Sequence, residues 1–128
     1  MLATASAAKS QNLNPIPVDV NSKSLMVEVE QLRRSDLKNV SAIMITQLNG
    51  LVADMEPIKD FCDEKDIVLI EDSAQAIGAF NNGKHAGSWG IGGCLSFYPA
   101  KIIGCLGDGG ALITNSQELA EFARSVRD

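Results

Sequence analysis

Short runs of apolar residues alternate along the chain with segments that have the periodicity of amphipathic helices. The runs at 15–20, 41–48, 66–71, 94–99 and 110–114 are rich in Val, Ile, Leu and aromatic residues. Several of them are apolar at consecutive positions, as strands are when both faces of their sheet are covered. We therefore expect five strands, most of them in the interior of a sheet.

Helical patterns lie between these runs. The small residues of "LATASAAK" at 2–9 favour a first helix. Apolar residues repeat every three or four positions over 25–32, behind a possible cap at Ser24, and again over 55–62, behind Asp54. Both patterns predict helices with one apolar face.

A last helical pattern covers 119–126, and the preceding "NSQE" is a capping box in which Asn115 is the cap and Glu118 the third helical residue. Alternation of strands and helices is typical of a three-layer α/β/α domain with a mostly parallel sheet. We expect residues 1–128 to form one such domain.

Composition narrows the class of protein. The 128 residues suffice for one core, and a net charge of −5 without a basic cluster disfavours a nucleic-acid or anionic membrane surface. No apolar stretch approaches the roughly 20 residues that span a bilayer, and the N-terminal residues lack the charge pattern of a signal peptide. Three cysteines without paired spacing fit a reduced, cytoplasmic setting and no metal site.

Polar residues follow two of the predicted strands. Glu71 and Asp72 end the most apolar strand, and Lys101 comes just after the next one, among glycines. In parallel sheets, ligands bind at the carboxyl ends of strands. A lysine amine is a nucleophile only when unprotonated, which an apolar environment favours, and a nearby aspartate can hold a pyridine nitrogen of a cofactor protonated.

Simpler interpretations exist for each of these residues. A lysine after a strand is most often solvated, Asp72 can cap a helix that follows it, and glycine clusters between strands are usually turns. The spacing of Asp72 and Lys101 leaves these alternatives open.

Longer strings are more specific. "IEDSAQAIGA", "GKHAGSWGIGGCLSFYPAK" and "GDGGALITNSQELAEFARSVRD" together resemble the DegT/DnrJ/StrS family of sugar aminotransferases that depend on pyridoxal 5′-phosphate (PLP). The resemblance extends over essentially the whole chain. It implies part of the large α/β domain of a PLP-dependent transferase.

The resemblance also implies roles for four residues. Lys101 is similar to the lysine that forms a Schiff base with the cofactor, and Asp72 to the partner of its protonated pyridine nitrogen. Gln75 is similar to a residue that contacts the phenolic oxygen or packs near the ring, and Ser96 to a serine that binds the phosphate.

Family membership would imply transfer of an amino group from an amino acid such as L-glutamate to a keto-sugar nucleotide, in a homodimer. Some relatives carry histidine in place of the lysine and are dehydratases. The presence of Lys101 therefore disfavours a dehydratase. The alternative is a catalytically inactive, truncated domain that serves as an interaction or regulatory module. A small nucleotide-binding domain is disfavoured, because neither G-x-G-x-x-G after a first strand nor a Walker lysine is present.

The chain also departs from the family pattern. A Gly-Ser/Thr segment that binds phosphate and a C-terminal domain have no counterpart in it, and the place of an aromatic residue that stacks on the cofactor falls at or before Met1. Gln47 stands where many members have a histidine, which leaves a substrate contact there open. We therefore expect the middle of the large domain, with a site that is partly present.

Overall fold

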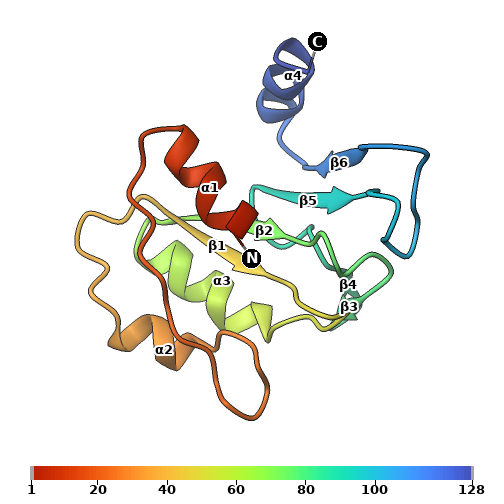
Figure 1. Cartoon of the computed structure of the whole chain (residues 1–128). Helices are drawn as coiled ribbons and strands as arrows, with labels where there is room; N and C mark the ends of the chain where they lie inside the picture. Colours follow the sequence, from red (N-terminus) through yellow and green to blue (C-terminus); the bar gives the residue numbers. More distant parts are fainter. Residues whose placement is uncertain (1, 128) are drawn as a thin grey trace.

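A four-stranded sheet forms the centre of the computed structural model, which describes residues 2–127 (Figure 1). Its strands are, in spatial order, β1 (Ala42–Thr46), β2 (Val68–Asp72), β5 (Gly92–Ser96) and β6 (Gly110–Ile113). The first three run parallel, and β6 runs antiparallel to β5. The expected mostly parallel sheet is confirmed.

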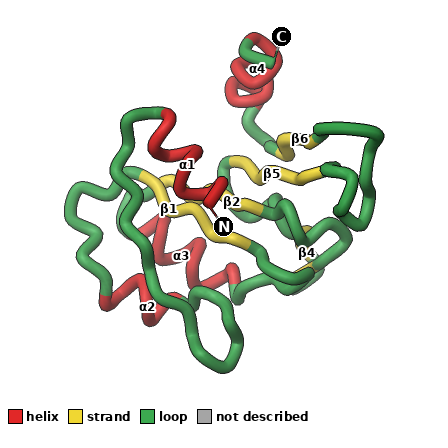
Figure 2. Tube along the Cα trace, viewed as in Figure 1, coloured by secondary structure: helices red, strands yellow, loops and turns green. Residues whose placement is uncertain are grey.

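Helices cover both faces of this sheet. The structure contains α1 (Leu2–Ser10), α2 (Val29–Arg34), α3 (Met55–Glu64) and α4 (Gln117–Ser125). Figure 1 shows α2 and α3 on one side of β1 and β2, α1 on the other side, and α4 projecting beyond β6. The long loop that joins α1 to α2 runs along the edge of the molecule (Figure 2).

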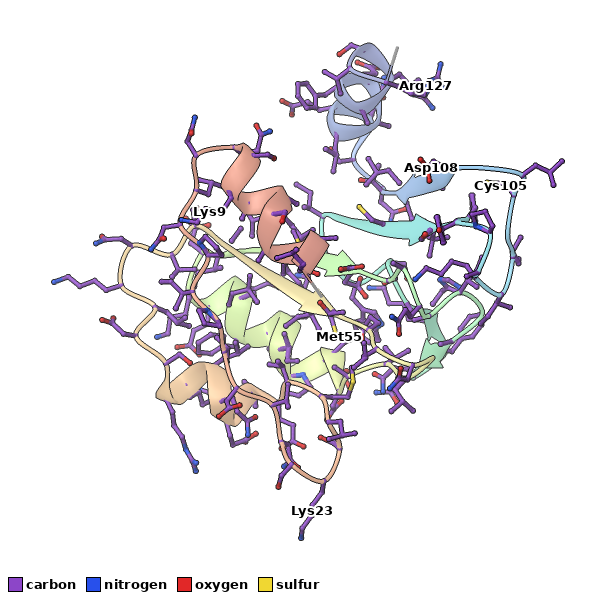
Figure 3. All side chains as sticks on the ribbon, in the orientation of Figure 1. Lys9, Lys23, Met55, Cys105, Asp108 and Arg127 are labelled. Carbon is purple, nitrogen blue, oxygen red and sulfur yellow. The ribbon has the colours of Figure 1, made fainter. Side chains whose placement is uncertain are left out.

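We call the side covered by α2 and α3 the closed face. Ile43, Ile45 and Leu69 point into it and pack with the apolar stripe of α3, which includes Ile58 and Phe61. Burial of a side chain of this size contributes roughly 1.5–3 kcal/mol to stability. Met55, at the start of α3, lies in the interior between that helix and the sheet (Figure 3). The closed face therefore holds the hydrophobic core.

We call the opposite side the open face. Met44 and Val68 point into it and remain 38% and 43% exposed. Neither α1 nor α4 contributes a buried residue, and Phe122 on the apolar stripe of α4 is 62% exposed. Because strand side chains alternate between faces, the same two strands supply both the core and this accessible surface.

A small hairpin, β3 (Phe80–Asn81) and β4 (Lys84–His85), was not expected from the apolar pattern. Its turn residues Asn82 and Gly83 both have positive φ, 47° and 75°. Asn-Gly is the residue pair that such two-residue turns favour, so "NNGK" carried a signal for it. The His85 ring packs edge-on against Phe80.

Two predictions about the N-terminal half are wrong. Residues 15–20 are not a strand, because two prolines remove backbone donors from this stretch. The helix expected over 25–32 behind Ser24 begins only at Val29, after a turn in which Leu25 has φ 58°.

Local hydrogen bonds explain the later start of α2. The Asn21 side-chain oxygen accepts from the amides of Lys23 and Ser24 and holds these residues in a turn. Glu28 then caps the helix in a reciprocal capping box with Gln31.

The remaining helix predictions are close to the structure. The helices expected over 2–9 and behind Asp54 are confirmed. The last helix has Ser116 as its cap, not Asn115: the Ser116 hydroxyl accepts from the Leu119 amide. Glu118 is therefore the second helical residue and Leu119 the third, so the expected capping box of Asn115 and Glu118 is wrong.

Candidate functional site

Asp72 is the last residue of β2, and its side chain points into the open face. It is in register with Thr46 of β1 and Cys94 of β5. The Thr4 hydroxyl donates to Oδ2 at 2.7 Å, and the Ala74 amide donates to Oδ1 at 3.3 Å. Residues 73–79 form turns instead of a helix, so the alternative that Asp72 caps a helix is wrong.

Glu71 points in the opposite direction and is fully buried in the closed face. One carboxylate oxygen accepts from the amides of Trp89, at 2.6 Å, and Gly90, at 3.2 Å. The other accepts from the Gly87 amide at 2.8 Å and from Gln47 Nε2 at 3.0 Å. Three of these four neutral donors are amides of segment 87–90, and they attach that segment to the strand immediately before Asp72.

Gln47 belongs to the same buried network. Its Nε2 also lies 3.1 Å from Met55 Sδ, and its Oε1 accepts from the Ala53 amide at 2.9 Å. The side chain is fully buried on the closed face, on the opposite side of the sheet from the Asp72 side chain. The structure thus assigns the side chain to the packing of the loop before α3 and not to contact with a substrate.

Close backbone approach explains two glycines near the site. A methyl group at Gly93 would lie 2.2 Å from Gly87 Cα, and one at Gly90 would lie 2.2 Å from the Leu69 carbonyl oxygen. Segment 87–90 therefore lies directly against β2 and β5, at distances that only glycine permits.

Strand β5 contributes Cys94 and Ser96 to the same face as Asp72. Burial raises the pKa of the Cys94 thiol, and the neighbouring Asp72 carboxylate raises it further. Ser96 is half-buried, and its hydroxyl accepts from the Tyr98 amide at 3.3 Å. Asp72 and Ser96 thus end two adjacent strands at one edge of the sheet.

Gln75 lies in the turn that follows Asp72. Its Oε1 accepts from the Asn49 amide at 3.1 Å, which joins the loop after β1 to the loop after β2. The side chain is half-buried. It is therefore held at the carboxyl end of the sheet, next to the strand that carries Asp72.

Lys101 lies in the loop between β5 and β6, and its amide donates to the Tyr98 carbonyl at 2.8 Å. The loop is closed on itself, because Phe97 N donates to Gly109 O and Cys105 N donates to Phe97 O, both at 2.8 Å. The Lys101 side chain is half-buried. Within residues 2–127 its ammonium makes neither an ion pair nor a hydrogen bond. The structure thus brings Asp72, Gln75 and Ser96 to one edge of the sheet, and no contact joins the Lys101 side chain to these three described residues.

Other kinds of site find no support in the described part of the chain. Its His, Cys, Asp and Glu residues form no group of three that is able to hold a metal ion. None of its helices combines the length and the apolar character of a membrane span.

The sequence matches the DegT/DnrJ/EryC1/StrS aminotransferase family over residues 1–128. This chain belongs to that family. It is 39% identical over 98% of its length to a pleiotropic regulatory protein of Geobacillus stearothermophilus. It is 37% identical over 99% of its length to a UDP-N-acetyl-3-dehydro-α-D-glucosamine 3-aminotransferase of Acidithiobacillus ferrooxidans. In each case the chain spans about a third, 34%, of the relative's length.

Solved structures agree on the fold. A DegT/DnrJ/EryC1/StrS aminotransferase from Brucella abortus superposes with a TM-score of 0.91 at 38% identity, over 98% of this chain and 36% of that one. NtdA from Bacillus subtilis, solved with the bound cofactor PMP, superposes with a TM-score of 0.84 at 30% identity, over 94% of this chain and 27% of that one. The expected α/β fold of PLP-dependent transferases, with a mostly parallel sheet between helices, is confirmed.

The residues at the sheet edge fit such a cofactor. PLP carries a basic pyridine nitrogen, a phenolic oxygen, a phosphate and an aldehyde, and the edge provides a carboxylate, an amide, a hydroxyl and, on the adjacent loop, a primary amine. Each oxygen of Asp72 has one donor and keeps lone pairs for a further one. Asp72 itself is half-buried on the open face, and Met44 of the adjacent strand is 38% exposed there.

Two features of the site were not predicted from the sequence: the contact of Thr4 with Asp72 and the hydrogen bonds to Glu71. Thr4 was expected only as a helical residue, and no local pattern connects it with Asp72. Glu71 was recognised as a residue at a strand end, but its four donors come from residues 47 and 87–90, which only the folded chain brings together.

Proposed function

We propose that the protein acts as a PLP-dependent aminotransferase that moves an amino group from an amino acid such as L-glutamate to a keto-sugar nucleotide. The observation that carries the proposal is the Asp72 carboxylate at the carboxyl end of β2, next to the strand whose following loop bears Lys101. The name of the Acidithiobacillus relative, a 3-aminotransferase of a UDP-linked dehydro sugar, supports the substrate class.

In this proposal PLP, when bound, supplies an electron sink for chemistry at the α-carbon of the amino donor. Asp72 accepts a hydrogen bond from the protonated pyridine nitrogen, since its charge favours that protonation state. Gln75 would contact the phenolic oxygen or pack near the ring, and the Ser96 hydroxyl would donate to the phosphate. Lys101 would hold the cofactor through its amine, and the same amine would serve as general base and acid for the substrate proton.

Exposed apolar side chains on and near the open face suggest that a second protein surface covers it. Apolar side chains are accessible on the sheet, on α4 and on the loop that bears Lys101, where Ile102 and Leu106 are exposed. Large apolar surfaces of this kind are usually covered by further protein. We propose that a homodimer covers part of them. All three cysteines are free thiols, which fits our proposal of a cytoplasmic location.

The decisive experiment is covalent trapping. The purified protein is mixed with PLP and reduced with borohydride, and the modified residue is located by mass spectrometry. We expect pyridoxyl modification at Lys101, abolished in Lys101→Ala and retained in Lys84→Ala. Lys84 is an exposed lysine on the hairpin and serves as the matched control.

Absence of modification at Lys101 under saturating PLP would contradict the proposal and favour an inactive interaction or regulatory module. Equal modification of several surface lysines would mean nonspecific reaction and would also contradict it. Amino transfer from L-glutamate is then assayed with keto-sugar nucleotides of the UDP and dTDP series, which tests the substrate class.

A further inference from the structure

The contact between Thr4 and Asp72 joins two residues that are 68 positions apart. Thr4 Oγ1 donates to Asp72 Oδ2 at 2.7 Å in a half-buried position. A hydroxyl that donates to a carboxylate makes a charge-assisted hydrogen bond, which is shorter and stronger than a neutral one. This bond connects α1 to the proposed cofactor carboxylate.

Few other contacts hold α1 in place. None of its nine residues is buried, and only Thr4 and Ala8, one turn apart on the same side of the helix, are half-buried. A helix of this length is marginal by itself in water. The order of α1 therefore depends on its docking to the open face, and Thr4 provides the polar part of that docking.

The two donors to Asp72 come from different directions in the chain. Ala74 N, two residues further along, bonds Oδ1, and Thr4 of α1 bonds Oδ2. One donor on each oxygen fixes the rotation of the carboxylate plane, which a single donor would leave free.

We propose that Thr4 is a positioning residue that fixes the Asp72 carboxylate and couples the docking of α1 to the proposed PLP site. This inference rests on the proposed function, because it concerns the acceptor that meets the pyridine nitrogen. Loss of the Thr4 hydroxyl leaves Oδ2 without its donor and releases α1. The carboxylate then loses its fixed orientation toward the ring.

The first test needs no cofactor. Hydrogen exchange of the α1 amides is measured by mass spectrometry in the wild-type protein and in three variants: Thr4→Val, which removes the hydroxyl and keeps the shape, Thr4→Ser, which retains it, and Ser6→Ala, which removes an exposed hydroxyl from the same helix. We expect exchange about tenfold faster in Thr4→Val, the factor that corresponds to one hydrogen bond to a charged group. Thr4→Ser and Ser6→Ala should match the wild type. Wild-type exchange in Thr4→Val would overturn the inference.

The second test reports on the ring itself. PLP labelled with ¹⁵N in the pyridine ring is bound to each protein, and the ¹⁵N chemical shift reports the protonation of that nitrogen. We expect Thr4→Val to move the shift toward that of the unprotonated ring, and Thr4→Ser to restore the wild-type value. An unchanged shift in Thr4→Val would overturn the inference while the proposed function stands. Failure of the wild-type protein to bind PLP would contradict the proposed function, and the exchange comparison would still decide whether Thr4 holds α1.

Discussion

Glu71 and Asp72 are neighbours on β2, but their side chains lie in opposite environments. Glu71 is fully buried in the closed face, where its two oxygens accept four hydrogen bonds from neutral donors. Asp72 is half-buried on the open face, where each oxygen accepts one. The carboxylate with its full set of partners stabilises the fold, and the carboxylate with remaining lone pairs has room for a ligand.

The same contrast separates the two faces of the sheet. On the closed face, α2 and α3 pack against β1 and β2 and form the core. On the open face, α1 contributes no buried residue. Substitutions on the two faces should therefore differ in kind: those on the closed face should reduce stability, and those on the open face should change chemistry with little loss of stability.

The largest effect that tests this contrast is expected at Glu71. In Glu71→Gln, an NH₂ group replaces one of the oxygens that face backbone donors, so buried amides of segment 87–90 lose their acceptor. We expect the free energy of unfolding to fall by about 3 kcal/mol, measured by urea denaturation. Asp72→Asn is the comparison on the open face and should cost less than about 1 kcal/mol. Equal losses in the two variants would remove the distinction between the faces.

The next effect is expected at Gly93. The methyl group of Gly93→Ala meets Gly87 Cα at 2.2 Å, a backbone atom that moves only if segment 87–90 leaves the sheet. We expect a loss of about 2 kcal/mol in thermal or urea unfolding, typical of an overpacked interior. Gly107→Ala is the matched control, because no atom lies within 4 Å of the added methyl group, and its stability should equal that of the wild type.

The smallest effect concerns Cys94 on the open face. The Asp72 carboxylate is one cause of the raised pKa of this thiol, so Asp72→Asn should lower that pKa. Because the thiolate is the reactive form, the variant should have more of it at every pH below the pKa, and alkylation by iodoacetamide at pH 8 should be roughly two- to fivefold faster.

Both cysteines are exposed, so site-resolved mass spectrometry is needed to separate Cys94 from Cys105, whose rate should not change. The pH profile of Cys94 alkylation should shift to lower pH in the variant. An unchanged profile would mean that the Asp72 charge does not act on the thiol.

The sequence was most informative where a local pattern determines the structure. The apolar runs of β1 and β2 and the stripe of α3 are set by burial, so their periodicity was sufficient to predict them. The prediction failed at 15–20 and at 25–32. There the apolar residues flank prolines or a turn held by Asn21, and hydrogen bonds of the backbone overrode the pattern.

The site was predictable only in part, for a similar reason. The apolar run at 66–71 placed Asp72 at the end of β2. The run at 94–99 extends beyond β5, which ends at Ser96, so Ser96 became a candidate only through the family resemblance. The Thr4 contact and the Glu71 network depend on residues that are distant in sequence, and no local pattern encodes them. Roles for Lys101 and Gln75 came from the family resemblance and await the labelling experiment.

The separation of Thr4 from Asp72 also sets an order of assembly. Closing a loop between residues 68 positions apart costs entropy that this one hydrogen bond does not offset, so the bond forms after β1, α3 and β2 have come together. Of the described elements, α1 leaves the ribosome first and yet must wait for a partner that is made much later. We therefore expect the core of the closed face to fold first and the contact of α1 with Asp72 to form last.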